Sequence, residues 1–187
     1  MCRSFRDDPV ADDVLDRVLA AAFRGPAAGN TWGLDLLVLR DRETRAYWGV
    51  TLPDPEGFAW PGLLRAPVLV IPVVDPGAYV ARYGEDDKAT SGLGAGEHAW
   101  SVPYWWVDGG AAVMGILLAA EDEGLGALFF GQFEHEGAVS ARFAIPDGRR
   151  SLGTVALGWP SDAGRAPSRS AVKGRPDPGD FTHQGHW

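Results

Sequence analysis

The chain has a single cysteine, Cys2, and no apolar run long enough to cross a bilayer. One cysteine excludes an internal disulfide framework and fits a reducing compartment. The longest apolar run, around Ala111 to Ala120, is too short for a membrane span, and the first six residues lack the apolar core of a signal peptide. These absences predict a cytoplasmic protein.

Positive charge is also scarce, with 17 Lys and Arg against 25 Asp and Glu and a formal net charge of −8. An acidic chain repels nucleic acids and anionic membranes, so the sequence predicts neither as a partner. Any anionic ligand has to be bound by a local group of Arg and Lys that acts against the overall field.

The common catalytic and nucleotide-binding motifs are missing as well. The sequence contains no G-x-G-x-x-G, no G-x-x-x-x-G-K-[ST] and no G-x-S-x-G. His183 and His186 are three residues apart, but no nearby thiolate or carboxylate completes a metal shell, so we expect no metal site. We therefore predict no catalytic side chain, and the composition favours a protein whose chemistry comes from an organic cofactor.

What the chain does have is a sizeable apolar fraction, 45% over 187 residues, which suits one domain spanning residues 1–187. Its 25 glycines and 14 prolines predict long irregular connections. Eight tryptophans are a high count. Each of them fits a place in the core or a place in a ligand pocket equally well.

Hydrophobic periodicity predicts helices that alternate with short strands. We expect a first helix that begins after Val10 and ends near Arg24, a second from Gly109 to Glu123 with Asp108 as its cap, and a third from Glu136 to Phe143 before Pro146. We expect strands over Leu34–Leu39, Val68–Val74, Ala127–Phe130 and Thr154–Gly158, with a charged turn over Arg40–Arg45 and an exposed, mobile loop over 84–102.

Two of these elements carry further expectations. Pro72 inside the second strand indicates a sheet edge or a bulge. The Gly109–Glu123 helix is apolar on all sides, which predicts a buried helix or a subunit interface. Because the first element is a helix and residues 160–187 form an extended arm, the pattern favours a mixed α+β layer fold over a doubly wound one.

Four segments, in this order and spacing, resemble the nitroreductase family of FMN enzymes. They are Arg3-Ser4-Phe5 with Asp8-Pro9-Val10, the loop Gly25 to Thr31, Trp106 to Gly110 with its helix and Gly124 to Gly131, and Leu157 to Pro160 with Lys173 to Pro176. The resemblance implies a mostly antiparallel sheet flanked by helices and a long central helix at a homodimer interface. It also implies an FMN cofactor, NAD(P)H as electron donor and a small aromatic or electron-poor acceptor such as a nitroaromatic or a quinone, reduced by a ping-pong mechanism.

The same resemblance assigns cofactor contacts to residues of this chain. Charge-assisted hydrogen bonds suit Lys and Arg to the FMN phosphate, and small side chains let backbone approach the flavin. The implied cofactor residues are Arg3, Ala27, Ala28, Gly29, Asn30, Phe129, Phe130, Gly131, Lys173 and Arg175. The implied substrate residues are Trp32, Tyr104, Trp105 and Trp106, for which a core or interface role fits the sequence equally well.

The opening motif aligns in two ways. Anchored on Pro9-Val10, Arg3 takes the place of the family's last basic residue, and the earlier Arg and Ser would lie before Met1. The other register places Ser4 and Arg6 on that Ser and Arg but requires a deletion. In the first register the Lys173 and Arg175 pair becomes the main phosphate contact.

A second departure leaves a rival function open. Trp32 stands where the family usually has a glutamine, which removes a polar side chain near the flavin. The alternative is a non-catalytic module that binds a flavin or deazaflavin, and a third possibility is a structural homodimer subunit with a vacant site.

Overall fold

The computed structural model describes residues 1–162 and 172–187. Its centre is an antiparallel sheet with the strand order β1 (Leu34–Arg40), β2 (Val68–Val74), β5 (Thr154–Gly158) and β3 (Gly126–Phe130). A short strand, β4 (Arg150–Ser151), also pairs with β2. The fold is α+β with a five-stranded antiparallel sheet, as the sequence predicts, and all four expected strands are confirmed.

The central strand β2 is buried along its whole length, so the expected sheet edge at Pro72 is wrong. The alternative expectation, a bulge, agrees with the pairing of β2 with its neighbours on this side. β2 pairs with β5 before the proline and with β4 after it, and the register shifts by one residue in between. The Pro72 carbonyl accepts a hydrogen bond from the Leu152 N–H. Because the N–H and C=O of one strand residue point to the same side, the N–H that proline lacks would point to the break between β4 and β5 and not to β1. The strand therefore loses no ladder bond to β1.

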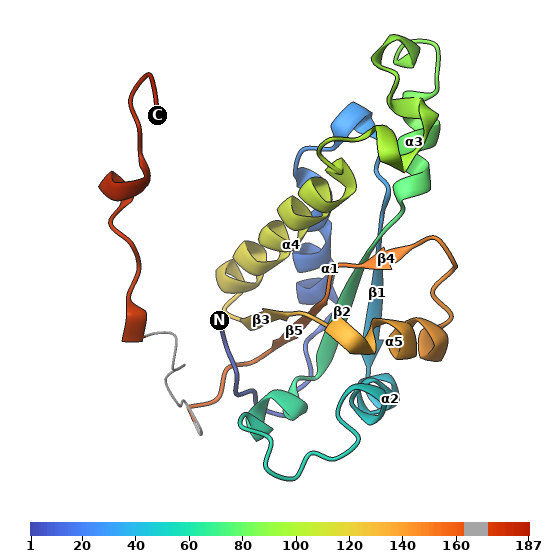
Figure 1. The fold of residues 1–187 in the computed structure, drawn as a ribbon. Helices are drawn as coiled ribbons and strands as arrows, with labels where there is room; N and C mark the ends of the chain where they lie inside the picture. Colours follow the sequence, from blue (N-terminus) through green and yellow to red (C-terminus); the bar gives the residue numbers. More distant parts are fainter. Residues whose placement is uncertain (163–171) are drawn as a thin grey trace.

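Helices cover both faces of the sheet (Figure 1). On one face α1 (Asp12–Ala20), which continues as a 3₁₀ turn over Ala21–Arg24, packs with α4 (Tyr104–Asp122). On the other face lie α2 (Arg42–Thr51) and α5 (Glu136–Phe143). The remaining helix, α3 (Pro76–Tyr83), follows the end of β2.

Three expectations about these helices need correction. The expected turn at Arg40–Arg45 is wrong, because Arg42 begins α2, whose residues Thr44 and Tyr47 are buried on the sheet. The central helix begins at Tyr104 rather than Gly109, after Pro103, so Asp108 lies inside the helix and is not its cap. The segment 84–102 is mostly exposed, as expected, but it is folded into three short 3₁₀ turns, and its Trp100 is buried against Tyr79.

The two sides of α4 have different environments, although both are apolar. Ala112, Val113 and Ile116 are buried against the sheet and α1. On the outer side Met114 is 51% exposed and Leu118 is 60% exposed. Within the described residues, no helix is both long and apolar enough to cross a membrane. An apolar face left open to solvent is a candidate for an interface.

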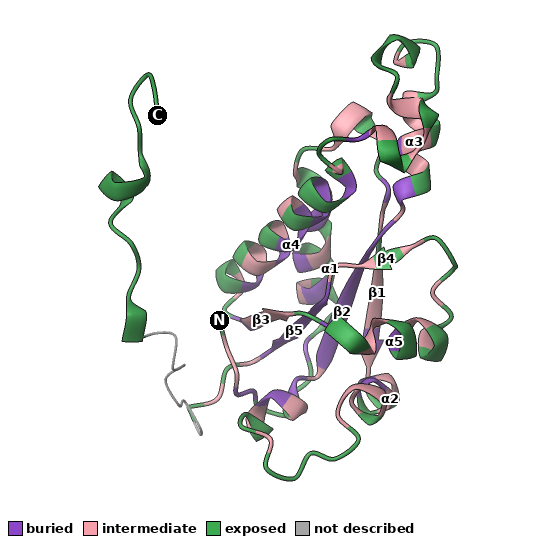
Figure 2. Cartoon of the chain, in the orientation of Figure 1, coloured by how far each residue is buried: buried purple, intermediate pink, exposed green. Residues whose placement is uncertain are grey.

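The C-terminal segment 172–187 stands apart from the sheet and its helices (Figures 1 and 2). It contains the 3₁₀ turn Pro178–Phe181, is also 3₁₀ at residues 172–173, and has no regular secondary structure over the rest of 174–187. Every residue of this segment is exposed, including the apolar Val172, Phe181 and Trp187. An arm over residues 160–187 therefore stays a prediction.

Candidate functional site

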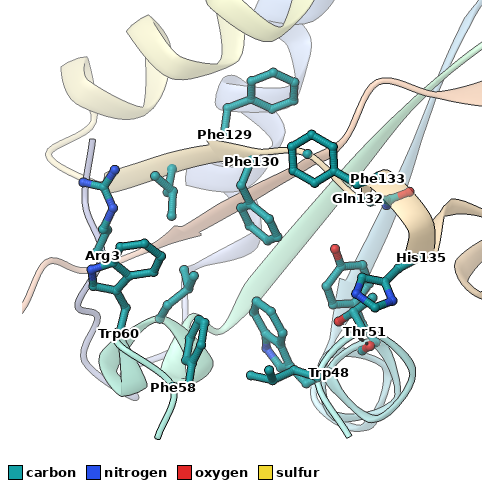
Figure 3. A pocket seen from close by; sticks show the side chains of 15 residues that line it. Arg3, Trp48, Thr51, Phe58, Trp60, Phe129, Phe130, Gln132, Phe133 and His135 are labelled. Atoms are coloured by element: carbon teal, nitrogen blue, oxygen red, sulfur yellow. Dashed lines mark hydrogen bonds between the residues drawn. The ribbon is translucent and has the colours of Figure 1, made fainter. Parts of the chain in front are cut away.

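A cavity of about 400 Å³ opens beside the C-terminal end of β3 (Figure 3). Four of the residues assigned to the cofactor from the sequence line it together: Arg3, Phe129, Phe130 and Gly131. They come from the N-terminal segment and from β3, which lie side by side because the Cys2 N–H donates to the Ala127 carbonyl. The volume lies within the range typical of small-molecule sites.

The walls of this pocket are mainly aromatic. Trp48 from α2 stacks on Phe130, with the ring centres 5.8 Å apart and the planes 10° from parallel. Phe58 meets Trp60 edge to face at 5.9 Å. The buried indole Nε1 of Trp48 has no hydrogen-bond partner in the part of the chain that the structure describes. Such walls suit a flat ring with an acceptor atom at its edge.

The charged lining of the pocket is cationic. The Arg3 guanidinium lies over the Trp60 ring, 5.3 Å from its centre, and the only other ionisable side chains on the lining are His135 and Tyr47. Arg6, the basic residue of the rival register, instead pairs with Asp8 at 3.1 Å. Among the described residues, Arg3 makes no ion pair with a carboxylate. It is therefore free to meet an anionic ligand inside an acidic protein.

Below the pocket, a buried polar network fixes the end of β3. Gln132 is buried and donates through Nε2 to the Thr154 hydroxyl at 3.0 Å, while its Oε1 accepts from the Ser151 hydroxyl. The Thr154 hydroxyl also bonds the Tyr47 phenol at 2.8 Å, and burial raises the pKa of that phenol. Because each buried polar group is paired, the backbone at Gly131 has a fixed position.

The network continues toward α4 through charged residues. Glu136 accepts from the Ser151 N–H and forms an ion pair with Arg150 at 2.8 Å. The Arg150 guanidinium lies 5.7 Å from the centre of the Trp106 ring. Trp106, assigned to substrate contact from the sequence, is thereby linked to the pocket, although it does not line it.

The loop 27–30 lies elsewhere, between α3 and α4. The Ala28 N–H donates to the Asp108 carboxylate at 2.7 Å, and the Tyr79 hydroxyl donates to the same oxygen at 2.9 Å. The Gly29 carbonyl accepts from Arg82 at 2.9 Å. Asn30 accepts through Oδ1 from the Trp32 indole N–H. These bonds hold the loop in one conformation, but Ala27, Ala28, Gly29, Asn30 and Trp32 do not line the pocket.

An aromatic cluster packs next to this loop. Trp105 and Trp100 are buried, with their ring centres 5.6 Å apart, and both meet Tyr79 edge to face at 6.1 Å. Tyr104, the first residue of α4 and the one before Trp105, is 43% exposed. Within one chain, Trp105 therefore acts as core, while Tyr104 and Trp106 retain surface for a ligand.

The structure thus brings the predicted site residues into three groups. Arg3 and the end of β3 form the pocket, the loop 27–32 and α4 form a second group, and Lys173 and Arg175 lie on the separate C-terminal segment. The described residues hold no group of three His, Cys, Asp or Glu side chains arranged for a metal ion.

Sequence reasoning assigned four of the fifteen described lining residues to the site and left out the other eleven. The aromatic side chains among those left out are Trp48, Tyr47, Phe58, Trp60 and Phe133. The sequence carried one usable signal for the first of these. Thr44, Tyr47, Trp48 and Thr51 follow Asp41 at helical spacing, which is typical of an amphipathic helix.

Comparison with known proteins supports this architecture. The family model described as the nitroreductase family matches residues 1–159. A protein of Archaeoglobus fulgidus, provisionally named NADH dehydrogenase/NAD(P)H nitroreductase, is 27% identical over 86% of this chain and 80% of its own length. A protein named NADH dehydrogenase from Thermus thermophilus is 27% identical over 87% of this chain and 83% of its own.

Solved structures share the fold at lower identity. An FMN-dependent nitroreductase from Clostridium difficile R20291 is 17% identical, with a TM-score of 0.66 over 100% of this chain and 94% of its own. A hypothetical oxidoreductase from Bacillus subtilis is 24% identical, with a TM-score of 0.72 over 100% of this chain and 70% of its own.

Proposed function

Because the family model covers residues 1–159, the chain belongs to the nitroreductase family, and we propose that it is an FMN-dependent oxidoreductase that uses NAD(P)H. The names of its relatives support an NAD(P)H oxidoreductase, and one structural neighbour is described as FMN-dependent. The single observation that carries the proposal is the pocket at the end of β3. It combines flat aromatic walls with an arginine that has no carboxylate partner among the described residues.

The residues of the pocket fit a flavin on chemical grounds. The stacked Trp48 and Phe130 rings match a flat ring system, and the partnerless Trp48 Nε1 offers a donor to a carbonyl oxygen at the ring edge. Arg3 would meet an oxygen-rich or anionic edge of the cofactor. Phe129, Phe130 and Gly131 would supply backbone at the end of β3, where a side chain on residue 131 would crowd the site.

When bound, FMN supplies the redox chemistry by accepting a hydride from NAD(P)H and passing electrons to an acceptor. We propose that donor and acceptor use the same face in turn, the acceptors being nitroaromatics, quinones or similar electron-poor compounds. The protein's own contribution is to stack, to donate hydrogen bonds and to exclude water. No side chain of the pocket has to act as acid or base.

We propose further that two copies of the chain complete the site. The outer face of α4 leaves Val107, Met114 and Leu118 exposed, and segment 172–187 stands apart from the sheet and its helices, with all of its residues exposed. Lys173 and Arg175 lie on that segment, away from the pocket. A segment that crosses to a second copy would bring both cations to its phosphate site and would couple flavin binding to dimerisation.

Charge reversal tests the role of the C-terminal segment. Lys173→Glu with Arg175→Glu should weaken FMN binding roughly tenfold or more, because two charge-assisted contacts become repulsive. The melting temperature of the flavin-free protein should stay unchanged, since neither side chain contacts the folded body. Arg42→Glu with Arg45→Glu, on the exposed side of α2, is the matched control and should keep wild-type affinity. Equal losses of affinity and stability would contradict the proposal.

The enzyme proposal is tested by visible spectroscopy. Protein supplied with excess FMN and desalted should remain yellow, and anaerobic NADH or NADPH should bleach the flavin band. A yellow protein that neither nucleotide bleaches would instead support a non-catalytic flavin- or deazaflavin-binding module. A colourless monomer would refute flavin binding altogether.

A further inference from the structure

Phe133 holds an unusual position at the mouth of the pocket. It begins the 3₁₀ turn Phe133–His135 directly after β3 and the buried Gln132. Its backbone is left-handed, with φ 47°, and its side chain is 83% exposed. Its ring nevertheless belongs to the pocket lining, and in Figure 3 it stands on the β3 side, across from Trp48 and His135.

Folding alone does not account for this residue. A bulky side chain on a left-handed backbone is strained, and positions of this kind usually carry glycine or asparagine. An exposed ring buries little apolar surface that could offset the strain. Strained backbone that persists without a packing benefit is found at ligand contacts.

The ring also covers a specific place in the pocket. A Cβ built on Gly131 would lie 2.8 to 3.1 Å from three atoms of the Phe133 ring. The ring therefore rests on the bare backbone of Gly131, which only a residue without a side chain allows. A flat molecule that binds next to Gly131 would therefore lie close to this ring.

We propose that Phe133 selects flat aromatic acceptors by stacking on them at the mouth of the pocket. The inference rests on the proposed function, because it places the acceptor next to the site assigned to the cofactor. It adds a specificity-determining residue that is independent of Arg3 and of the C-terminal cations. The Arg3 guanidinium on the lining further favours aromatic acids over neutral rings of the same size.

A matched pair of ligands tests the stacking directly. Benzoate and cyclohexanecarboxylate carry the same charge and a similar bulk, but only benzoate is flat and aromatic. Their dissociation constants are measured on the protein as purified and after FMN loading, by fluorescence quenching. Phe133→Ala should weaken benzoate roughly three- to tenfold and cyclohexanecarboxylate by less than about twofold, whereas Phe133→Tyr should keep both near wild type.

Turnover provides a second readout. The kcat/KM for 4-nitrobenzoate should fall by a similar roughly three- to tenfold factor in Phe133→Ala, and by more than the rate with ferricyanide, which needs no stacking. Flavin content and bleaching by NADH or NADPH are measured on wild type and variant, and the kcat/KM is expressed per bound flavin. Those two measurements report on the proposed function separately, and the ligand pair tests Phe133 even in a protein that does not turn over.

Stability distinguishes ligand contact from a structural role. Phe133→Gly removes the left-handed strain and should not lower the melting temperature, and Ala144→Gly, at another left-handed position with φ 53° outside the pocket, is the control for strain relief alone. A large loss of melting temperature in Phe133→Ala, or equal weakening of benzoate and cyclohexanecarboxylate, would overturn the proposal. So would unchanged binding of benzoate.

Discussion

Two parts of the molecule are rich in aromatic residues, and they use them in different ways. Beside the loop 27–30, Tyr79, Trp100 and Trp105 are buried and meet edge to face. Beside β3, Trp48, Trp60 and Phe133 surround a cavity of about 400 Å³, and Phe133 is 83% exposed. The first group is an aromatic core, and the second lines the cavity that we propose as the binding site.

The two regions also differ in whether their polar groups have hydrogen-bond partners. In the aromatic core, the Asp108 carboxylate receives both the Ala28 N–H and the Tyr79 hydroxyl. At the pocket, the network below the floor is satisfied, but Trp48 Nε1 and the Arg3 guanidinium lack polar partners among the described residues. A region that serves folding satisfies its own donors, whereas a region that serves binding leaves donors for a ligand.

Paired tryptophan substitutions should separate the two regions most strongly. Trp105→Ala creates a cavity in the aromatic core and should lower the free energy of unfolding by about 3–5 kcal/mol. Trp60→Ala removes a side chain that is 38% exposed and should cost about 1 kcal/mol or less, yet weaken FMN binding. Urea unfolding and FMN titration of both variants measure the contrast. If Trp60→Ala unfolds as easily as Trp105→Ala, the pocket is a part of the core.

Asp108→Ala should have the next largest effect. It leaves one buried and one partly buried donor unpaired and should cost about 2–3 kcal/mol in the free energy of unfolding. Asp108→Asn is the control, because one amide oxygen can accept both bonds, and it should cost about 1 kcal/mol. Chemical denaturation measures both values. Equal costs would mean that the carboxylate charge, rather than its accepting oxygen, fixes the loop.

Tyr79→Phe should act on the alkaline side of the stability profile. Burial, together with the hydrogen bond to Asp108, raises the pKa of the Tyr79 phenol. A raised pKa stabilises the fold below the unfolded value of about 10, and the stabilisation is lost as the pH rises through the folded value. The variant should be about 1–2 kcal/mol less stable at pH 8, and its deficit should shrink above about pH 10. A deficit that is constant to pH 11 would contradict the assignment.

Glu136→Gln should give the smallest change, on the acidic side. Arg150 lowers the pKa of Glu136 through a hydrogen-bonded ion pair. A lowered pKa stabilises the fold above the unfolded value of about 4.3, and the stabilisation disappears as the pH falls through the folded value. Because Arg150 is 55% exposed, the loss at pH 7 should be at most about 1 kcal/mol and should vanish at low pH. Thermal melts at both pH values test this, and a loss that persists in acid would exclude the ion pair as its source.

The sequence predicted the strands and the helices with clear periodicity, because each has an uninterrupted apolar pattern. It missed α2, since the charges of Arg42, Glu43 and Arg45 hide a pattern in which only one face is buried. It also placed Asp108 at a helix start, because an acidic residue before glycines is typical of a cap. Its true partners, Ala28 and Tyr79, are 80 and 29 residues away in the sequence and become visible only in the fold.

The site was predictable only in part, for the same reason. The end of β3 and Arg3 could be identified by resemblance to the family, and the structure brings them together. The tryptophans could not be sorted, because Trp105 and Trp60 look alike until their burial is known. Phe133 gave no signal at all, since its left-handed backbone and its contact with Gly131 are properties of the turn after β3.

The central claim is that the pocket at the end of β3, and not the aromatic core beside the loop 27–30, takes the planar cofactor. Hydrogen–deuterium exchange of the flavin-free protein, with and without saturating FMN, tests it most directly. We predict that FMN protects the amides of residues 129–135 and of the N-terminal segment around Arg3. Protection confined to residues 93–106, or no protection despite bound flavin, would contradict the account.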